Sequence, residues 1–400
     1  MRELHGLTTH VNTTKHLIPV KDMCPVLLST GIEKAMPYMA SKDFVIKAQD
    51  DGKIVEFDQK TNMMIAEYKN GKHEAINLNG IMVKNAGGGF YLENKMLPMY
   101  KVGQRFKKDD ILAQNKDYYS YHYDGAKFNL GTLSKIAIMS SFATFEDSNM
   151  ITEGLSKRMG TEMVMQKHLI LGPNATVSQI VNVGDKILVG QPLITYEQSA
   201  DEESVNRLLR GIGKDLREDI KSMAKNTLTS KYSGVVDEIR IYSTEEISDL
   251  SKSLGSIVDK YWKGIREKKK LIRKYKITDP SDQGSTFYEI DGPVKPNAAG
   301  AVKGYKIEHG VIIEFYIKFT DNMKPGDKMA HHLALKGTVA LVIPDDQAPY
   351  TLDRPNEPIE SCIPATSVLA RQTIGILPTM FSQKLLVELK HQLKDMYEKG

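Results

Sequence analysis

The chain has 400 residues, of which 41% are hydrophobic and 26% are charged, and its formal net charge is +4. This composition is typical of a globular protein and excludes a disordered or fibrous chain. The length exceeds what one compact core usually organises, so we expect two or three domains.

Cysteine usage and hydropathy limit the cellular compartments in which the protein is expected. Cys24 and Cys362 are the only two cysteines, which argues against a disulfide framework, favours a reducing compartment and excludes zinc held mainly by cysteine. No apolar run reaches the roughly 18 residues of a membrane-spanning helix, and the first residues lack a signal-peptide core. We therefore expect a soluble, intracellular protein without a membrane partner.

Strand-like alternation dominates the first third of the chain. Residues 44–58, FVIKAQDDGKIVEFD, predict a hairpin around Asp50-Asp51-Gly52. Residues 63–78, MMIAEYKNGKHEAINL, predict a second hairpin around Asn70-Gly71. This region is therefore expected to be built from short antiparallel strands.

Further along the chain, the pattern alternates between strands and helices. Residues 131–160 contain a β-rich run, an acidic pair at its end and an apolar segment with helix formers, and residues 168–197 return to short strands. Apolar residues at helical spacing predict one helix over 201–225 and another over about 244–276, and a last helix is expected over 381–398.

These elements predict an α+β chain that is mainly β and has three parts. Residues 1–160 hold the N-terminal connector, the hairpins and the first part of a β body. Residues 161–295 form an inserted unit with two helices. Residues 296–400 hold the second part of the body, a lysine-rich loop and the C-terminal helix.

The acidic pair is the first candidate site. Glu146 and Asp147 are adjacent, and adjacent carboxylates raise the cost of ionising one another unless a cation or water shares them. Magnesium favours one or two carboxylates together with substrate phosphates, so a divalent-metal role fits. The alternative is an exposed strand end or helix N-terminus, where acids are common.

The second candidate site is the loop KPGDKMAHHLALKG, residues 324–337. Lys328 and Lys336 follow a Pro-Gly turn and could face one triphosphate or nucleic-acid strand, although a solvated turn would carry the same charges. His331 and His332 are neighbours, so joint metal ligation is not expected. The basic helix tail at 263–276 leaves a similar choice between a solvated face and a phosphate-tracking surface.

The order of these motifs resembles the β subunit of multisubunit DNA-directed RNA polymerases. FEDS at 145–148 is followed by KPGDKMA and then Lys336-Gly337, as in the family pattern GDKMAGRHGNKG. Four further segments are similar in the same order: LLSTGIEKAM, YKVGQRFKKDDILA, VNVGDKILVGQPLI and ATSVLARQTIGIL. The family's Arg, His and Asn in the lysine motif are replaced here, which puts any RNA contact of those side chains in doubt.

The resemblance implies a fold and a reaction. The body would be a double-psi β-barrel, with the insert standing where the family has its flap. The chain would be the C-terminal β portion of the catalytic core and would contribute nucleotide and RNA phosphate contacts to template-directed phosphoryl transfer. The catalytic Mg²⁺ would be held mainly by three aspartates of a partner β′ chain; these 400 residues contain no such loop, so the chain alone is expected to be inactive.

The resemblance also implies residue roles. Glu146 and Asp147 would face the incoming nucleotide and its second magnesium, and Lys328 and Lys336 would lie near the RNA 3′ end and the nucleotide phosphates. Arg371 matches a triphosphate-binding arginine of the family. The site of another triphosphate-binding arginine would be taken by Lys15, although a lysine lacks bidentate phosphate geometry.

A β subunit divided among several polypeptides is similar to the polymerases of giant bacteriophages. The expected partners are an N-terminal β fragment, one or more β′ fragments, a promoter-specificity factor, DNA template, RNA product and ribonucleoside triphosphates. The expected location is the cytoplasm of an infected bacterial host, with virion packaging left open. One alternative is a non-catalytic nucleic-acid-binding barrel protein; another, a single-chain RNA-dependent polymerase, would need its own three-aspartate loop.

Overall fold

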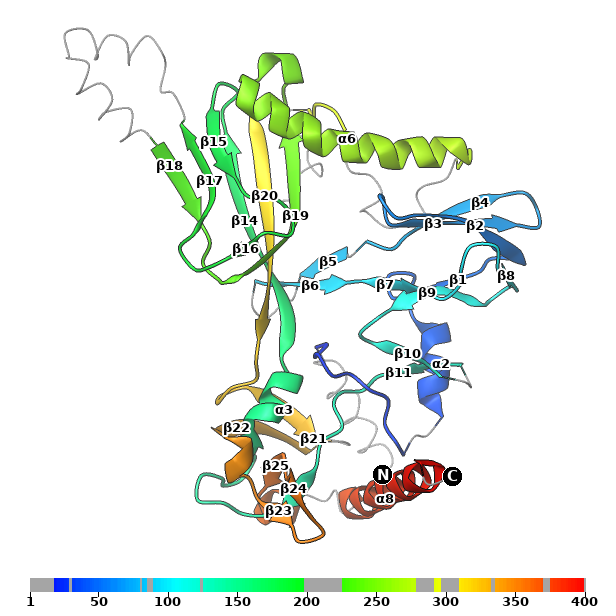
Figure 1. Cartoon of the computed structure of the whole chain (residues 1–400), viewed down its shortest axis with the longest axis vertical. Coiled ribbons are helices and arrows are strands. Elements are labelled where there is room, and N and C mark those ends of the chain that lie inside the picture. Colours follow the sequence, from blue (N-terminus) through cyan, green and yellow to red (C-terminus); the bar gives the residue numbers. More distant parts are fainter. Residues whose placement is uncertain are drawn as a thin grey trace, which may run out of the picture. The chain divides into compact units, whose positions relative to one another are not determined.

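A computed structural model describes residues 18–28, 31–79, 81–84, 89–122, 125–197, 225–277, 291–295, 309–331, 335–369 and 375–398 (Figure 1). The chain forms two compact units. Unit 1 comprises 1–41, 115–162 and 320–400, and unit 2 comprises 42–114 and 163–319. Strands make up most of the regular structure in the described ranges, which confirms the expectation of a mainly β chain. The three domain boundaries predicted from the sequence stay a prediction.

Unit 1 is built around one mixed sheet whose strand order is β12-β25-β13-β22-β21. Its elements are α2 (Ile32–Met39), β10 (Tyr119–His122), β11 (Gly125–Phe128), β12 (Ile136–Ile138), β13 (Ser148–Thr152), α3 (Glu153–Arg158), β21 (Lys328–His331), β22 (Leu335–Ile343), a 3-10 turn (Asp345–Gln347), β23 (Tyr350–Thr351), β24 (Arg354–Pro358), β25 (Ser361–Ile363), α7 (Ala365–Leu369) and α8 (Ile376–Glu398). β13 runs parallel to β22 and antiparallel to β25, while β21 and β22 form a hairpin.

The sheet of unit 1 is strongly coiled. In a flat sheet β21 and β25 would lie three strand spacings apart, about 14 Å. Yet the His331 side chain on β21 is hydrogen-bonded to Ser361 on β25, with 2.9 Å between Nε2 and Oγ. Leu335 on β22 also packs in one apolar cluster with Ile363 on β25. The two sides of the sheet therefore curl toward each other around a shared interior.

Unit 2 contains one six-stranded sheet and several smaller sheets. Its elements are β1 (Val45–Lys47), β2 (Gly52–Asp58), β3 (Met63–Tyr68), β4 (His73–Asn77), β5 (Ile81–Lys84), β6 (Tyr91–Asn94), β7 (Met96–Pro98), β8 (Arg105–Phe106), β9 (Ile111–Asn115), β15 (Thr176–Ile180), β16 (Lys186–Ile187), β17 (Pro192–Glu197), β18 (Lys225–Thr229), β19 (Gly234–Ser243), a 3-10 turn (Ile247–Asp249) and α6 (Lys252–Lys274). Two longer strands, β14 (Thr161–Leu171) and β20 (Val311–Asp321), each contain one of the four boundaries between the units.

The main core of unit 2 lies between a six-stranded sheet, β16-β19-β20-β14-β6-β5, and helix α6. Alternate β20 residues such as Ile313 and Phe315 are fully buried there. Helix α6 begins where the Ser251 hydroxyl accepts a hydrogen bond from the Leu254 amide, a typical N-cap. Its apolar stripe, which includes Trp262, covers this core. α6 confirms the helix predicted over about 244–276, whereas most of the helix predicted over 201–225 lies outside the described residues.

The two predicted hairpins had different outcomes. The hairpin at 63–78 is confirmed, because β3 and β4 pair across Asn70-Gly71, with Gly71 at φ 78°. The hairpin at 44–58 is wrong, because β1 pairs with β9 while β2 pairs with β3 and β8. The Asp51 carboxylate instead accepts a hydrogen bond from the distant Lys108 amide at 3.0 Å. Long-range pairing therefore overrides the local turn signal.

The basic tail of α6 contacts the rest of unit 2. Figure 1 shows α6 extending from the large sheet toward β3 and β4. Leu271 is buried there with Met63 and Ile65, and the Lys274 ammonium lies 2.6 Å from the Glu56 carboxylate. Neither sequence interpretation of the tail, a solvated face or a phosphate-tracking surface, describes these internal contacts.

Shortening Leu271 to alanine is therefore expected to lower the free energy of unfolding by about 2 kcal/mol, the lower end for a buried leucine. Hydrogen exchange at the β3 and β4 amides should report the loss. The exposed neighbour Lys270 is the matched control, and Lys270→Ala should leave exchange unchanged. Equal effects of the two substitutions would contradict the packing role of Leu271.

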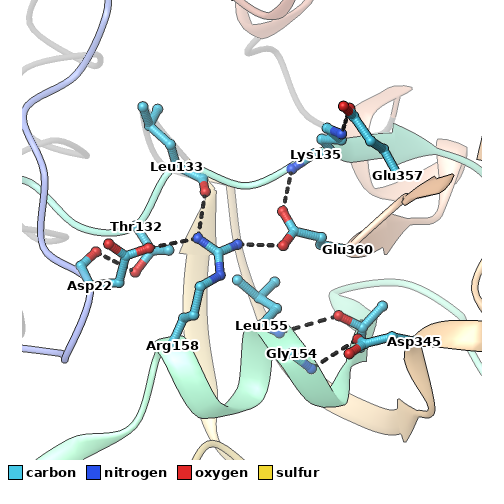
Figure 2. Close-up of polar contacts among 11 residues, drawn as sticks. Asp22, Thr132, Leu133, Lys135, Gly154, Leu155, Arg158, Asp345, Glu357 and Glu360 are labelled. Carbon is cyan, nitrogen blue, oxygen red and sulfur yellow. Dashed lines mark hydrogen bonds and ion pairs between the residues drawn. The ribbon is translucent and has the colours of Figure 1, made fainter. Parts of the chain in front are cut away.

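Arg158, at the end of α3, ties three parts of unit 1 together (Figure 2). Its guanidinium lies 2.7 Å from the Asp22 carboxylate, donates to the Leu133 carbonyl at 3.0 Å and pairs with Glu360. The Glu360 carboxylate also accepts from the Lys135 amide at 2.9 Å. One planar cation thus holds together three segments: the N-terminal segment, the region of β12 and the chain before β25.

Replacing Arg158 with alanine should lower the free energy of unfolding by about 2 kcal/mol, because two partly buried carboxylates lose their cation. Arg158→Lys keeps the charge but loses the planar fork, so it should recover only part of that stability. Urea unfolding of the three proteins measures both effects. Identical midpoints for wild type and Arg158→Ala would show that the cluster contributes nothing.

The structure contains no helix, within the residues it describes, that is both long and apolar enough to cross a membrane.

Candidate functional site

The two candidate lysines lie on one face of the β21–β22 hairpin. Lys328 is paired with Thr338 across the hairpin, and Ala330 is paired with Lys336. Since side chains alternate along strands and paired residues share a face, Lys328 and Lys336 are diagonal neighbours with Cα atoms about 7–8 Å apart. Both are exposed, and neither forms an ion pair with another residue in the described ranges. This face is therefore able to bind an anion from outside the chain.

The opposite face of the hairpin is buried. Met329, Leu335 and Val339 are each at most 7% exposed and pack in the apolar clusters of unit 1. This alternation explains why apolar residues interrupt the charges in residues 324–337. The core anchors the hairpin through one face, so the lysines are presented on a fixed backbone.

The acidic pair lies in a tight turn that leads into β13. The sequence interpretation, which put Glu146 and Asp147 at the end of an apolar strand, is wrong in this detail, because β12 ends well before them at Ile138. Asp147 has φ 55°, a left-handed conformation that aspartate tolerates better than most residues. Its amide donates to the Ser367 hydroxyl at 3.0 Å, so α7 helps to hold this conformation.

The acidic turn and the lysine hairpin are directly joined. The Thr338 amide donates to the Asp147 carbonyl at 2.7 Å, and Ser148 pairs with Thr338 in the parallel β13–β22 ladder. Ser148, Thr338 and Lys328 thus form a row across three strands, which spans about 10 Å. Both candidate sites predicted from the sequence therefore belong to one surface of unit 1.

Gly337 permits this close approach. A β-carbon at this position would lie 2.4 Å from the Asn149 amide nitrogen Nδ2 and 2.7 Å from the Asp147 carbonyl oxygen. Both distances are far below van der Waals contact, so any larger residue would push β22 away from the acidic turn. This role of Gly337 has no signal in the sequence, because it depends on the pairing of β13 with β22.

The remaining predicted site residues cannot be compared with this geometry. Lys15 and Arg371 lie outside the described residues, as does His332. Other residues of the site were missed by sequence reasoning. Ser367 and Ser361 have no distinctive sequence signal, and they are recognised only through their hydrogen bonds to Asp147 and His331.

His331 is buried beneath the lysine face. It is 4% exposed, and burial lowers the pKa of its imidazole to about 4. Its Nε2 is hydrogen-bonded to Ser361, while its Nδ1 has no partner among the residues that the structure describes. The neutral imidazole is therefore the form that fits this interior.

The depressed pKa of His331 predicts a pH dependence of stability. Because the unfolded chain binds this proton near pH 6.5 and the folded chain only near pH 4, stability should be full above pH 6.5 and fall on acidification. The loss should reach about 2 kcal/mol by pH 5. His331→Gln cannot take up this proton, so its unfolding free energy should change less between pH 7 and pH 5. Identical pH profiles would contradict this assignment.

The carboxylates alone do not form a metal centre. No group of three or more potential metal ligands occurs in the described part of the chain. Glu146 and Asp147 could supply at most part of a magnesium shell, which usually includes substrate phosphates and water. Their chemistry thus fits a contributing role beside ligands from elsewhere.

Comparison with known proteins identifies the family. The family described as RNA polymerase Rpb2, domain 6, matches residues 173–396, which include the lysine hairpin but not the acidic turn. The β subunit of DNA-directed RNA polymerase from Lactiplantibacillus plantarum is 23% identical over 377 residues, covering 91% of this chain and 27% of that protein. The corresponding protein of Borrelia duttonii is 23% identical over 390 residues, covering 92% and 28%.

The chain thus spans about a quarter of the length of these relatives. Because the family match covers more than half of the chain, this protein belongs to the RNA polymerase Rpb2 domain 6 family.

Proposed function

We propose that this chain is the C-terminal β portion of the catalytic core of a DNA-directed RNA polymerase. The observation that carries the proposal is the surface of unit 1, where Lys328 and Lys336 share an exposed face beside the Glu146-Asp147 turn. Family membership supports the reaction class. Phosphoryl transfer depends mainly on positioning and on neutralising negative charge, and this surface offers both.

Each side chain has a specific role in the proposal. Lys328 and Lys336 attract the phosphates of the RNA 3′ end and the incoming nucleotide as point charges. Arg371 binds the triphosphate, and Lys15 assists it. The buried face of the hairpin and the Ser367 hydrogen bond keep the surface in place before substrate arrives.

Magnesium is the expected cofactor, held mainly by a partner β′ chain. When bound, it stabilises negative charge on the reacting phosphate oxygens. Glu146 and Asp147 would face the incoming nucleotide and its second magnesium, and would act on that ion indirectly. A chain with these two carboxylates alone is expected to be inactive by itself.

The sheet of unit 1 is the proposed double-psi β-barrel, which the His331–Ser361 hydrogen bond across the coiled sheet supports. The flap-like insert is proposed to span 161–295.

The other proposed partners are an N-terminal β fragment, a promoter-specificity factor, DNA and RNA. We further propose that the subunit is divided as in the polymerases of giant bacteriophages, which would place it in the cytoplasm of an infected bacterium.

Native purification of the chain from its source, with mass spectrometry of its companions, tests this proposal. The expected companions include a chain with a three-aspartate loop and a second β fragment, and the purified material should incorporate ribonucleotides. A chain that is recovered alone and inert, but still binds nucleic acid, would instead favour the non-catalytic binding protein.

A further inference from the structure

Two phenylalanines beside the acidic turn are exposed to an unusual degree. Phe142 is 96% exposed and Phe145 is 74% exposed. Burying a phenylalanine typically stabilises a protein by about 1.5–3 kcal/mol, and neither ring contributes that stabilisation to this fold. A function outside the fold would account for their exposure.

The backbone that carries both rings is well anchored. The Ser141 amide donates to the Thr144 hydroxyl at 3.0 Å, which closes a turn around Phe142. The next turn begins at Phe145, whose amide donates to the Ser148 hydroxyl at 2.7 Å. The rings are thus presented from a preorganised backbone, which lowers the entropic cost of binding.

The position of this segment relative to the lysines is fixed by the strand register. Ser148, at the end of the second turn, starts the row that continues through Thr338 to Lys328. That row spans about 10 Å, the length of roughly three stacked nucleotides at about 3.4 Å each. A short single strand can therefore span the row from Lys328 to Ser148, which closes the turn that begins at Phe145.

The charges along this surface match the parts of a nucleotide. The lysines attract phosphate, whereas the carboxylates of Glu146 and Asp147 repel it. The uncharged bases are therefore favoured toward the phenylalanines, where aromatic rings offer sequence-independent stacking. A protein partner would gain apolar contact from the rings but would not explain the neighbouring lysine face.

We propose that Phe142 and Phe145 form a stacking platform for bases of a single-stranded nucleic acid whose phosphates bind Lys328 and Lys336. This inference rests on the proposed phosphate-binding role of the two lysines. It assigns to this surface a base-binding part in addition to its phosphate-binding part.

Binding of two fluorescent oligonucleotides to the full chain tests the platform. One is an eight-residue oligodeoxyadenylate, and the other is an abasic eight-residue strand with the same phosphate charge. Wild type should bind the oligodeoxyadenylate about tenfold more tightly, as expected for stacking of at least one base. The double variant Phe142→Leu/Phe145→Leu should bind both strands equally, because leucine keeps apolar bulk but lacks a ring.

Control variants separate stacking from other effects. Tyrosine at 142 and 145 should restore the preference for bases, and Phe381→Leu should not alter it, since that ring is 73% exposed on α8. Because Phe142 and Phe145 are so exposed, their replacement should leave the unfolding midpoint unchanged.

The possible outcomes distinguish this inference from the proposed function. Lys328→Ala/Lys336→Ala should weaken binding of both strands. If it does so while wild type shows no preference for bases, the platform is wrong and the phosphate-binding role stands. If the lysine variant binds both strands normally, the phosphate-binding role is wrong. A leucine variant that keeps its base preference but loses a copurifying chain would show that the rings contact a protein. Undetectable binding of oligodeoxyadenylate to wild type would also overturn the platform.

Discussion

Alanine at both Lys328 and Lys336 should slow nucleotide addition by the assembled complex about 100-fold. Removal of a single preorganised donor from a charged transition state typically costs 10²–10³-fold. Both lysines lie on one exposed face and form no ion pair within the described ranges, so their charge is available to an anion from outside the chain. Single-turnover extension of a preassembled RNA primer measures this step.

Promoter binding provides the comparison for the lysine variant. It involves many phosphate contacts distributed over the complex, so it should change far less than nucleotide addition. Lys390→Ala, an exposed lysine on α8, is the matched control for general loss of positive charge. Equal losses of promoter binding and nucleotide addition would contradict a role at the reacting phosphates.

Gly337→Ala should lower the free energy of unfolding by about 2–4 kcal/mol. The added methyl group would lie 2.4 Å from Asn149 and 2.7 Å from the Asp147 carbonyl, so β22 must move. Overpacking costs about 1–3 kcal/mol, and loss of the Thr338–Asp147 hydrogen bond adds about 1 kcal/mol. Urea unfolding measures the change.

The control for Gly337→Ala is Gly264→Ala on helix α6. A β-carbon at Gly264 meets no atom within 4 Å, and alanine favours a helix, so this variant should be stabilised by up to about 1 kcal/mol. If Gly337→Ala unfolded at the wild-type urea concentration, the close approach of β22 to the acidic turn would be wrong. Exchange of the Thr338 amide would then identify whether the hydrogen bond persists.

Local signals in the sequence predicted local structure. Asn70-Gly71 favours a tight hairpin turn, and β3 and β4 form that hairpin. The apolar stripe of α6 likewise predicted a helix, because a period of 3.6 residues is set by the helix itself. At Asp50-Asp51-Gly52 the turn signal was misleading, since β1 pairs with the distant strand β9 and β2 pairs mainly with β3, the next strand of the chain.

The candidate site likewise combines features that the sequence predicted with features that it did not. Residue types and their order indicated Lys328 and Lys336, and the alternation of β21 and β22 explains why both lie on one face. The contribution of Gly337 could not be predicted, because it arises from a parallel pairing between strands far apart in the chain. The buried His331–Ser361 pair depends in the same way on the coiling of the sheet.

Charge density alone did not indicate which basic segment makes contacts within the chain. The tail of α6 is the most basic helical segment described, yet Leu271 and Lys274 make contacts within unit 2. The lysine face of the β21–β22 hairpin carries fewer charges, but it has an anchored backbone and adjoins a turn held by two hydrogen bonds. The two lysines are therefore distinguished by their position on an anchored hairpin and not by the density of charge.

The most direct test of the proposed function is template-directed ribonucleotide incorporation by the reconstituted complex, with and without this chain. We expect incorporation only when the chain is present, and a strong loss when it carries Lys328→Ala/Lys336→Ala. Incorporation at an unchanged rate by a complex lacking the chain would contradict its assignment to the catalytic core.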